Sequence, residues 1–82
     1  MISVALKYTP DVDRAPIILA SGRGNLGMEI KRIAELHKIP TVADEQLAET
    51  LSQFPTGKEI PESLYKAVAV VFQFLYTLER KI

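Results

Sequence analysis

The stretch that decides the fold is residues 15–24, Ala15-Pro16-Ile17-Ile18-Leu19-Ala20-Ser21-Gly22-Arg23-Gly24. Its first part, Pro16 to Ala20, is a continuous apolar and β-branched run, which predicts a central strand covered on both faces. Ser21-Gly22-Arg23-Gly24 breaks that strand, and apolar residues at helical spacing follow directly. We therefore expect a strand, a turn and a helix here, with the other elements arranged around them.

The helix after this turn is expected from about Asn25 to Lys38, because apolar residues recur on one face: Leu26, Ile30, Ile33, Ala34 and His37. Pro40 ends it. Thr41 to Ala43 then predicts a short strand, terminated by Asp44, whose carboxylate can cap the next helix. The pattern predicts a strand, a helix and a parallel strand.

The first strand is expected from Ser3 to Tyr8, since Val4, Leu6 and Tyr8 alternate with less apolar residues. Turn-forming residues from Thr9 to Arg14 follow, and Pro10 cannot donate to a strand ladder. These residues predict a hairpin-like connection to the strand at Pro16.

Two further helices are expected in the second half of the chain. A short one presents Leu47, Ala48, Leu51 and Phe54 on one face and ends at Pro55 and Gly57. A longer one begins at Pro61, a favourable first-turn residue, and runs to about Arg80. We expect its broad apolar face to pack across the sheet as the main core helix; that face carries Leu64, Ala67, Val68, Val71, Phe72, Leu75 and Leu78, widened by Val70, Phe74 and Tyr76.

Composition bounds the class of protein. The 82 residues are 48% hydrophobic with a formal net charge of zero, which predicts one domain over residues 1–82 and gives no field to attract nucleic acid. Cysteine is absent, no signal peptide is expected, and the longest apolar run, Ala67 to Leu78, is too short for direct membrane insertion. The fold class expected is α/β of an α+β-like kind, with a small central sheet of about three to four strands flanked by three helices.

A glycine motif gives the sharpest alternative function. Gly22, Gly24 and Gly27 form G-x-G-x-x-G after a predicted strand, with Asp44 about 20 residues further on. The motif is compatible with a small nucleotide- or anion-binding domain, although a dinucleotide fold needs a second half for which this chain has no room. The structural interpretation makes Gly22 and Gly24 turn residues with positive φ and Gly27 a point of close packing.

No residue pattern indicates catalysis, a metal site or a cofactor. His37 is the only histidine and lies where a helix is expected to end. The serines lack the setting of an activated nucleophile, and the acidic residues lack paired ligand spacings. We therefore expect a protein that is not an enzyme.

A small apolar patch is left ambiguous by the pattern. The patch consists of Ala15 and Pro16 at the start of a strand and of Ala48 and Leu51, one turn apart on a short helix. These residues are compatible either with a shallow binding surface or with the core.

Four segments in order carry a resemblance over nearly the whole chain: Val4 to Tyr8, Ala15 to Ala20, Leu47-Ala48 with Leu51, and Glu59-Ile60-Pro61-Glu62-Ser63-Leu64-Tyr65. They resemble the C-terminal cytoplasmic domain of the FlhB/YscU export-switch family, in a stand-alone form. The resemblance implies a role in flagellar or related type III protein export, in the cytoplasm and peripheral to the inner-membrane export apparatus. Full-length members cleave themselves at an Asn-Pro-Thr-His motif, whereas the one asparagine here, Asn25, precedes Leu26, so self-cleavage is not expected. An excised domain of a longer switch protein is the other interpretation.

The resemblance also implies binding surfaces. The family's substrate-docking patch maps onto Ala15, Pro16, Ala48 and Leu51, which would make export substrates one class of partner. Family domains pair the strand before the motif with the strand after it, so Val4, Leu6 and Tyr8 are expected on an open edge. The expected partner there is the membrane-embedded export gate, or a truncated FlhB-type protein, adding a strand.

Overall fold

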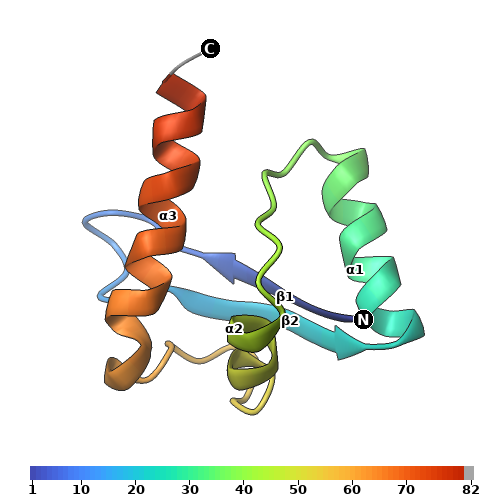
Figure 1. Cartoon of the computed structure of the whole chain (residues 1–82). Helices are drawn as coiled ribbons and strands as arrows, with labels where there is room; N and C mark the ends of the chain where they lie inside the picture. The colour runs from blue at the N-terminus through green and yellow to red at the C-terminus, as the bar shows by residue number, and fades with distance from the viewer. Residues whose placement is uncertain (81–82) are drawn as a thin grey trace.

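The computed structural model describes residues 1–80. Its elements follow in the order β1 (Ile2–Lys7), β2 (Ile17–Arg23), α1 (Asn25–Leu36), α2 (Glu45–Leu51), a 3₁₀ turn η1 (Glu62–Leu64) and α3 (Tyr65–Arg80). Helices α1 and α3 stand at opposite ends of the β1–β2 hairpin, α1 beside the N-terminus and α3 beside the hairpin loop (Figure 1). The result is an α+β fold with three α-helices, as the sequence predicts.

The sheet has two antiparallel strands, β1 and β2, instead of the three to four expected. Its register shifts between Ala5, which pairs with Ala20, and Leu6, which pairs with Ile18. Leu19 is therefore the extra residue of a bulge, and its side chain is 55% exposed. The prediction of a strand covered on both faces is wrong at this residue, because Leu19 points away from the buried side of Ile18 and nothing within residues 1–80 covers it.

The predicted strand at Thr41–Ala43 is wrong, and so is the predicted parallel unit. Residues 39–44 are neither helix nor strand. The outer edge of β2 is already occupied at its start: the Ile18 amide donates to the Lys58 carbonyl (3.0 Å), and the Gly57 amide donates to the Ile18 carbonyl (2.6 Å). The segment after α2 therefore takes the edge that a strand at 41–43 was expected to pair with.

Helix α1 ends at Leu36, two residues before the predicted end. Lys38 adopts a left-handed backbone (φ 57°), the Ile39 amide donates to the Ala34 carbonyl (2.8 Å), and the Lys38 amide donates to the Glu35 carbonyl (3.1 Å). These bonds form a Schellman motif, in which lysine stands where glycine is usual. His37 is the C-cap residue of α1, at the end of the helix where the sequence predicts it.

The start of α2 agrees with the sequence, whereas α3 begins four residues after the predicted start at Pro61. Asp44 caps α2, its carboxylate accepting a hydrogen bond from the Leu47 amide (3.0 Å). Pro61 precedes the last helical segment in an extended conformation, and η1 forms before α3 begins at Tyr65.

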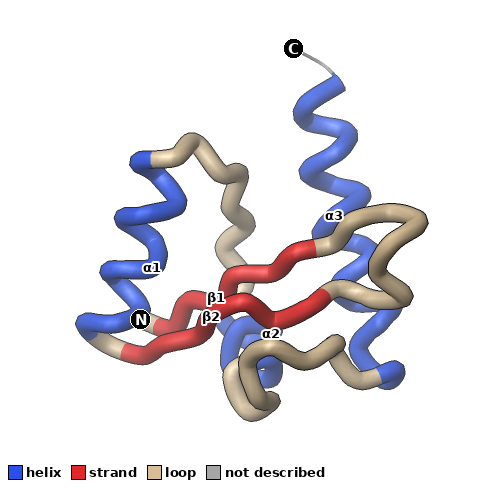
Figure 2. Tube along the Cα trace, turned by 180° about the vertical axis from the view of Figure 1, so that it is seen from behind, coloured by secondary structure: helices blue, strands red, loops and turns tan. Residues whose placement is uncertain are grey.

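The core is small and gathers residues from distant parts of the chain. The buried apolar residues are Ala15, Ile18, Leu51, Ile60 and Val68. Leu64 and Phe72 of the last helical segment pack against them, while Val70, Phe74 and Tyr76 are exposed. Helix α1, not α3, makes the broader contact with both strands. The prediction that this segment is the main core helix is confirmed, because Leu64, Val68 and Phe72 belong to the core, but α3 makes little close contact with the strands and its later turns extend away from the sheet (Figures 1 and 2).

Gly27 sets how closely α1 approaches the hairpin. A Cβ atom at this position would lie 2.7 Å from the Met1 carbonyl oxygen and 2.8 Å from the Gly22 carbonyl oxygen. Both neighbours are backbone atoms, so no side-chain rotation relieves the clash. The predicted close-packing role of Gly27 is confirmed.

We predict that Gly27→Ala lowers the free energy of unfolding by about 1–3 kcal/mol, the usual cost of overpacking a tight contact. Urea unfolding measures the change. Glu35→Ala, on the exposed side of the same helix, is the control and should stay within about 0.5 kcal/mol. Equal stability of the Gly27→Ala variant and the parent would contradict this packing role.

Candidate functional site

The hairpin loop between β1 and β2 is held by Asp13. The Asp13 carboxylate accepts a hydrogen bond from the Thr9 amide (2.8 Å) and lies 3.5 Å from the Lys7 ammonium group. The Asp13 amide in turn donates to the Thr9 carbonyl (2.8 Å). These bonds fix the path of the chain into Arg14, Ala15 and Pro16, which follow directly.

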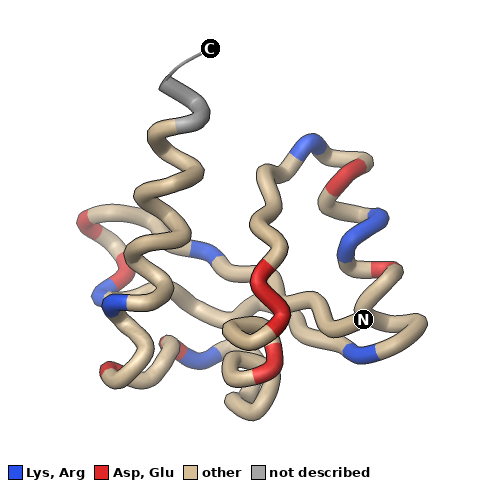
Figure 3. Tube along the Cα trace, in the orientation of Figure 1, with Lys and Arg blue, Asp and Glu red and all other residues tan. Residues whose placement is uncertain are grey.

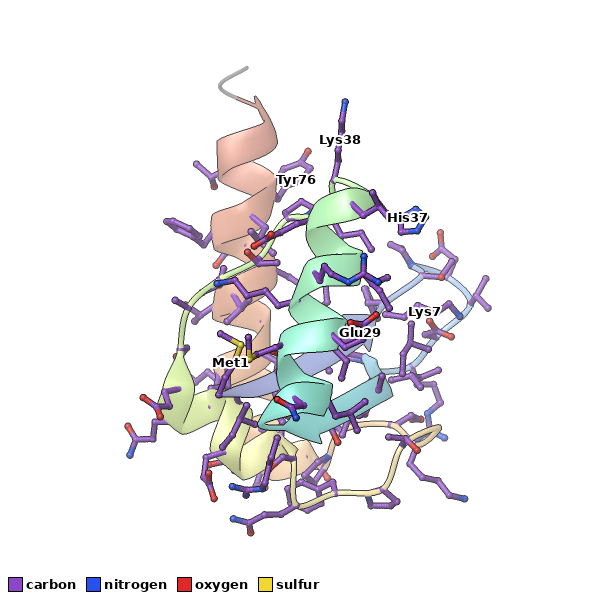
Figure 4. All side chains as sticks on the ribbon, turned by 90° about the vertical axis from the view of Figure 1, so that its right-hand side faces the viewer. Met1, Lys7, Glu29, His37, Lys38 and Tyr76 are labelled. Atoms are coloured by element: carbon purple, nitrogen blue, oxygen red, sulfur yellow. The ribbon has the colours of Figure 1, made fainter. Side chains whose placement is uncertain are left out.

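A groove of about 520 Å³ lies between the end of this loop and α3. We call it the aromatic groove; its lining residues are Tyr8, Arg14, Ala15, Pro16, Tyr65, Ala69, Phe72, Gln73 and Tyr76. The rings of Tyr8 and Phe72 are tilted by 53° with their centroids 6.2 Å apart, so the residue just after β1 contacts α3 through an aromatic pair. Figure 4 shows Tyr76 on α3, well away from the end of the hairpin that carries Met1.

The chemistry of the aromatic groove is that of a binding surface. Aromatic rings, alanine and proline supply apolar contact area, and tyrosine hydroxyls add hydrogen-bonding capacity at its rim. Arg14 is the one charged residue in the lining, and no carboxylate, histidine or serine accompanies it. Such a surface suits an apolar or aromatic segment of another protein.

The four predicted patch residues do not lie together at this surface. Ala15 and Leu51 are each 3% exposed and belong to the same core cluster, whereas Pro16 and Ala48 are half-buried. Ala15 and Pro16 line the aromatic groove, while Ala48 and Leu51 do not. The docking role assigned to these four residues stays a prediction, and the geometry pairs the first two with α3 instead of α2.

Sequence reasoning missed the α3 side of the groove. Tyr65, Ala69, Phe72 and Tyr76 are separated by four, three and four residues, so they form one row along α3. This row lies beside the buried row that contains Val68. The spacing of these residues could have indicated the row, but the core row and the groove row together appear in the sequence as one broad apolar face.

The predicted open edge is found on β1. Among the backbone hydrogen bonds of residues 1–80, β1 pairs with β2 alone, and its other edge has no strand beside it (Figure 2). Val4 and Leu6 are half-buried against the core, and Tyr8 lies just past the end of the strand. What β1 offers a partner is therefore mainly its backbone.

The glycine motif is explained by packing within the part of the chain that the structure describes. Gly24 has a positive φ (58°), as expected, and its amide donates to the Met1 carbonyl (2.8 Å). Gly22 does not have a positive φ; it is paired with Ser3 in the ladder, and its lack of a Cβ makes room for Leu26. Asp44 is engaged as a helix cap, and no parallel strand follows α1 among residues 1–80, so the dinucleotide arrangement is not formed.

Arg23, within the glycine motif, ties β2 to α2. Its guanidinium contacts both carboxylate oxygens of Glu49 (2.8 and 3.2 Å) and the Ser52 hydroxyl. The hydrogen bond and the charge of Arg23 lower the pKa of Glu49, and Glu49 raises the pKa of Arg23. A second exposed pair, Glu29 with Arg32 on α1, lowers the pKa of Glu29 in the same way; Figure 4 shows Glu29 on the half of α1 nearer the sheet.

Residues 1–80 contain neither a cluster of metal ligands nor a helix that could span a membrane. No group of three or more potential ligands lies close enough to hold a metal ion within residues 1–80. In the same range, every helix is too short or too polar to cross a bilayer.

The fold and the groove define a class: a small α+β domain with an apolar groove between its hairpin loop and its last helix. The chain belongs to the family described as the FlhB HrpN YscU SpaS family, whose model matches residues 1–75.

Relatives of two lengths match this chain. The flagellar biosynthetic protein FlhB of Aquifex aeolicus is 39% identical over 82 residues, covering 99% of this chain but only 23% of FlhB. The uncharacterized protein YlqH of Bacillus subtilis is 34% identical over 80 residues, covering 98% of this chain and 86% of YlqH. The chain thus spans less than a quarter of that FlhB and most of YlqH.

Solved structures agree with the fold. The C-terminal domain of PscU superimposes with a TM-score of 0.86 at 25% identity, over 90% of this chain and 95% of that one. The native SpaS C-terminal domain gives a TM-score of 0.91 over 99% of this chain and 94% of that one; at 17% identity, it supports the fold alone.

We predict that the Glu49 carboxyl titrates below the usual glutamate pKa of about 4.3 and that Arg23→Gln raises its pKa toward that value. Because the folded-state pKa is lowered, the pair stabilises the fold above the unfolded-state pKa and ceases to do so as the pH falls through the folded-state pKa. NMR titration of the side-chain carboxyl carbons measures the Glu49 pKa in the parent and in the Arg23→Gln variant. Glu29 is the internal control, since its partner Arg32 is unchanged; an unaltered Glu49 pKa in the variant would contradict the pairing.

Proposed function

We propose that this protein is a non-enzymatic component or regulator of flagellar or related type III protein export, which binds export substrates and the membrane-embedded export gate from the cytoplasm. The aromatic groove is the observation that carries the proposal, because it combines apolar area with one cationic side chain and contains no catalytic group. Family membership supports the export context. Its place is peripheral to the inner-membrane apparatus.

Substrates are proposed to dock in the aromatic groove through an apolar or aromatic segment. Burial of apolar surface provides about 25 cal/mol per Å², so one large side chain in the groove contributes on the order of 1.5–3 kcal/mol. A contact of this size gives weak, reversible binding, which suits a domain that must release its substrates.

The gate is proposed to bind at β1, independently of the groove. An unpaired strand edge presents alternate amides and carbonyls that an extended segment can pair with. Residues 40–43 also make no backbone hydrogen bonds within the described chain. An FlhB-type protein truncated before its C-terminal half is the partner proposed for this edge.

We predict that Ala69→Glu weakens binding of a purified flagellar export substrate at least 10-fold, because it places a charge in the apolar lining. Calorimetric titration measures the dissociation constant. Ala67→Glu is the matched control: the same change on the same helix, at a residue outside the aromatic groove. If both variants bound the substrate as tightly as the parent, docking in this groove would be disproved.

We predict that a truncated FlhB-type gate protein slows amide hydrogen exchange at alternate residues of β1 by at least 10-fold. In the free chain we expect these outward amides to exchange faster, because they have no backbone partner within residues 1–80. Amides of α1 serve as the control and should change little. Binding without added protection along β1 would contradict strand addition.

A further inference from the structure

A second groove, on the other side of α3, is not used by the proposed function. It has a volume of about 450 Å³ and lies between α2 and α3. We call it the acidic-rimmed groove; its lining residues are Asp44, Gln46, Leu47, Thr50, Ala67, Val70 and Val71. It shares no residue with the aromatic groove.

The walls of this groove are apolar. Leu47 is half-buried, and Val70 is 59% exposed although it lies in the middle of a helix. Ala67, Val70 and Phe74 are spaced by three and four residues, which places them on one row of α3, and Phe74 is also exposed. The row continues the apolar wall one turn beyond the groove.

The one charged residue in the lining is acidic. Asp44 lines the groove, Glu45 follows it at the start of α2, and no lysine or arginine is in the lining. Neither carboxylate has an ion-pair partner within residues 1–80. Figure 3 shows these acidic residues at the start of α2 and an uncharged stretch along most of α3. A cationic partner is therefore favoured over an anionic one.

The backbone of both walls decides which secondary structure the partner has. Beyond the first turn of α2, the amides and carbonyls of both walls bond within their own helices, so an extended segment lying along the groove would find few backbone partners. A helix satisfies its own backbone and needs only side-chain contact. The small side chain of Ala67 lets such a helix approach α3 closely.

From these observations we infer that the acidic-rimmed groove binds an amphipathic helix of a partner protein, with apolar residues on one face and lysine or arginine at its edge. The apolar face would pack against Leu47, Val70 and Val71, and the cation would lie near Asp44 and Glu45. This is the helix-in-groove mode of recognition. Because it uses a separate surface, this partner would bind together with a substrate or with the gate.

The test uses the full chain and a synthetic 16-residue amphipathic helical peptide of leucine, alanine and lysine. The comparison peptide has each lysine replaced by glutamate. We expect the lysine peptide to shift amide NMR signals of α2 and the first half of α3 and to bind at least 10-fold more tightly than the glutamate peptide. Equal affinity of the two peptides, or shifts centred on β1 or the aromatic groove, would overturn the inference.

Two variants with matched chemistry sharpen the test. Val70→Asp should weaken binding of the lysine peptide at least 10-fold, whereas Met28→Asp, which alters a similarly exposed residue (58%) on α1, should not. Circular dichroism checks that both variants remain folded. Undiminished binding to a folded Val70→Asp variant would refute the proposal, and so would concentration-dependent shifts at Val70 without peptide, which would indicate a second copy of this chain in the groove.

Discussion

Ile18 is the residue on which the rest of the structure depends. Its side chain is fully buried with Val68 of α3, and its own strand pairs it with Leu6 of β1. On the opposite edge its amide and carbonyl bond to the segment that carries Gly57 and Lys58. One residue therefore joins the hairpin, the connection after α2 and the last helix, in a core of only a few buried side chains.

This constraint explains the placement of both proposed export surfaces. Because the segment after α2 takes the outer edge of β2, the free edge of the sheet is on β1. Because α3 is anchored near its start by Val68, only one part of its circumference is buried, and the remainder forms walls for grooves. The surfaces available to partners follow from how little of α3 the small core can cover.

Local signals in the sequence predicted the elements well. Asp44 as a cap, Gly27 as a close contact, the hairpin loop and all three helices could be read from residue type and spacing. The number of strands could not be predicted, because the strand-like residues Thr41 to Ala43 form a strand only if their backbone comes within hydrogen-bonding reach of a sheet edge, which residue type does not indicate. The groove was predicted in part: Ala15 and Pro16 lie in it, but their partners on α3 are distant in sequence, and spacing alone cannot tell which helix row faces a loop.

The two rows on α3 have a consequence for how this helix can change. The later residues of both rows keep their directions only while the number of residues after Val68 is fixed; they are Ala69, Phe72 and Tyr76 in one row and Val70 and Phe74 in the other. One inserted residue would turn every later side chain by about 100° around the helix axis. In the exposed part of α3, an insertion should therefore disrupt both grooves, whereas most single substitutions should leave the rows in place. Such sensitivity to length is unusual for a segment with so few buried contacts.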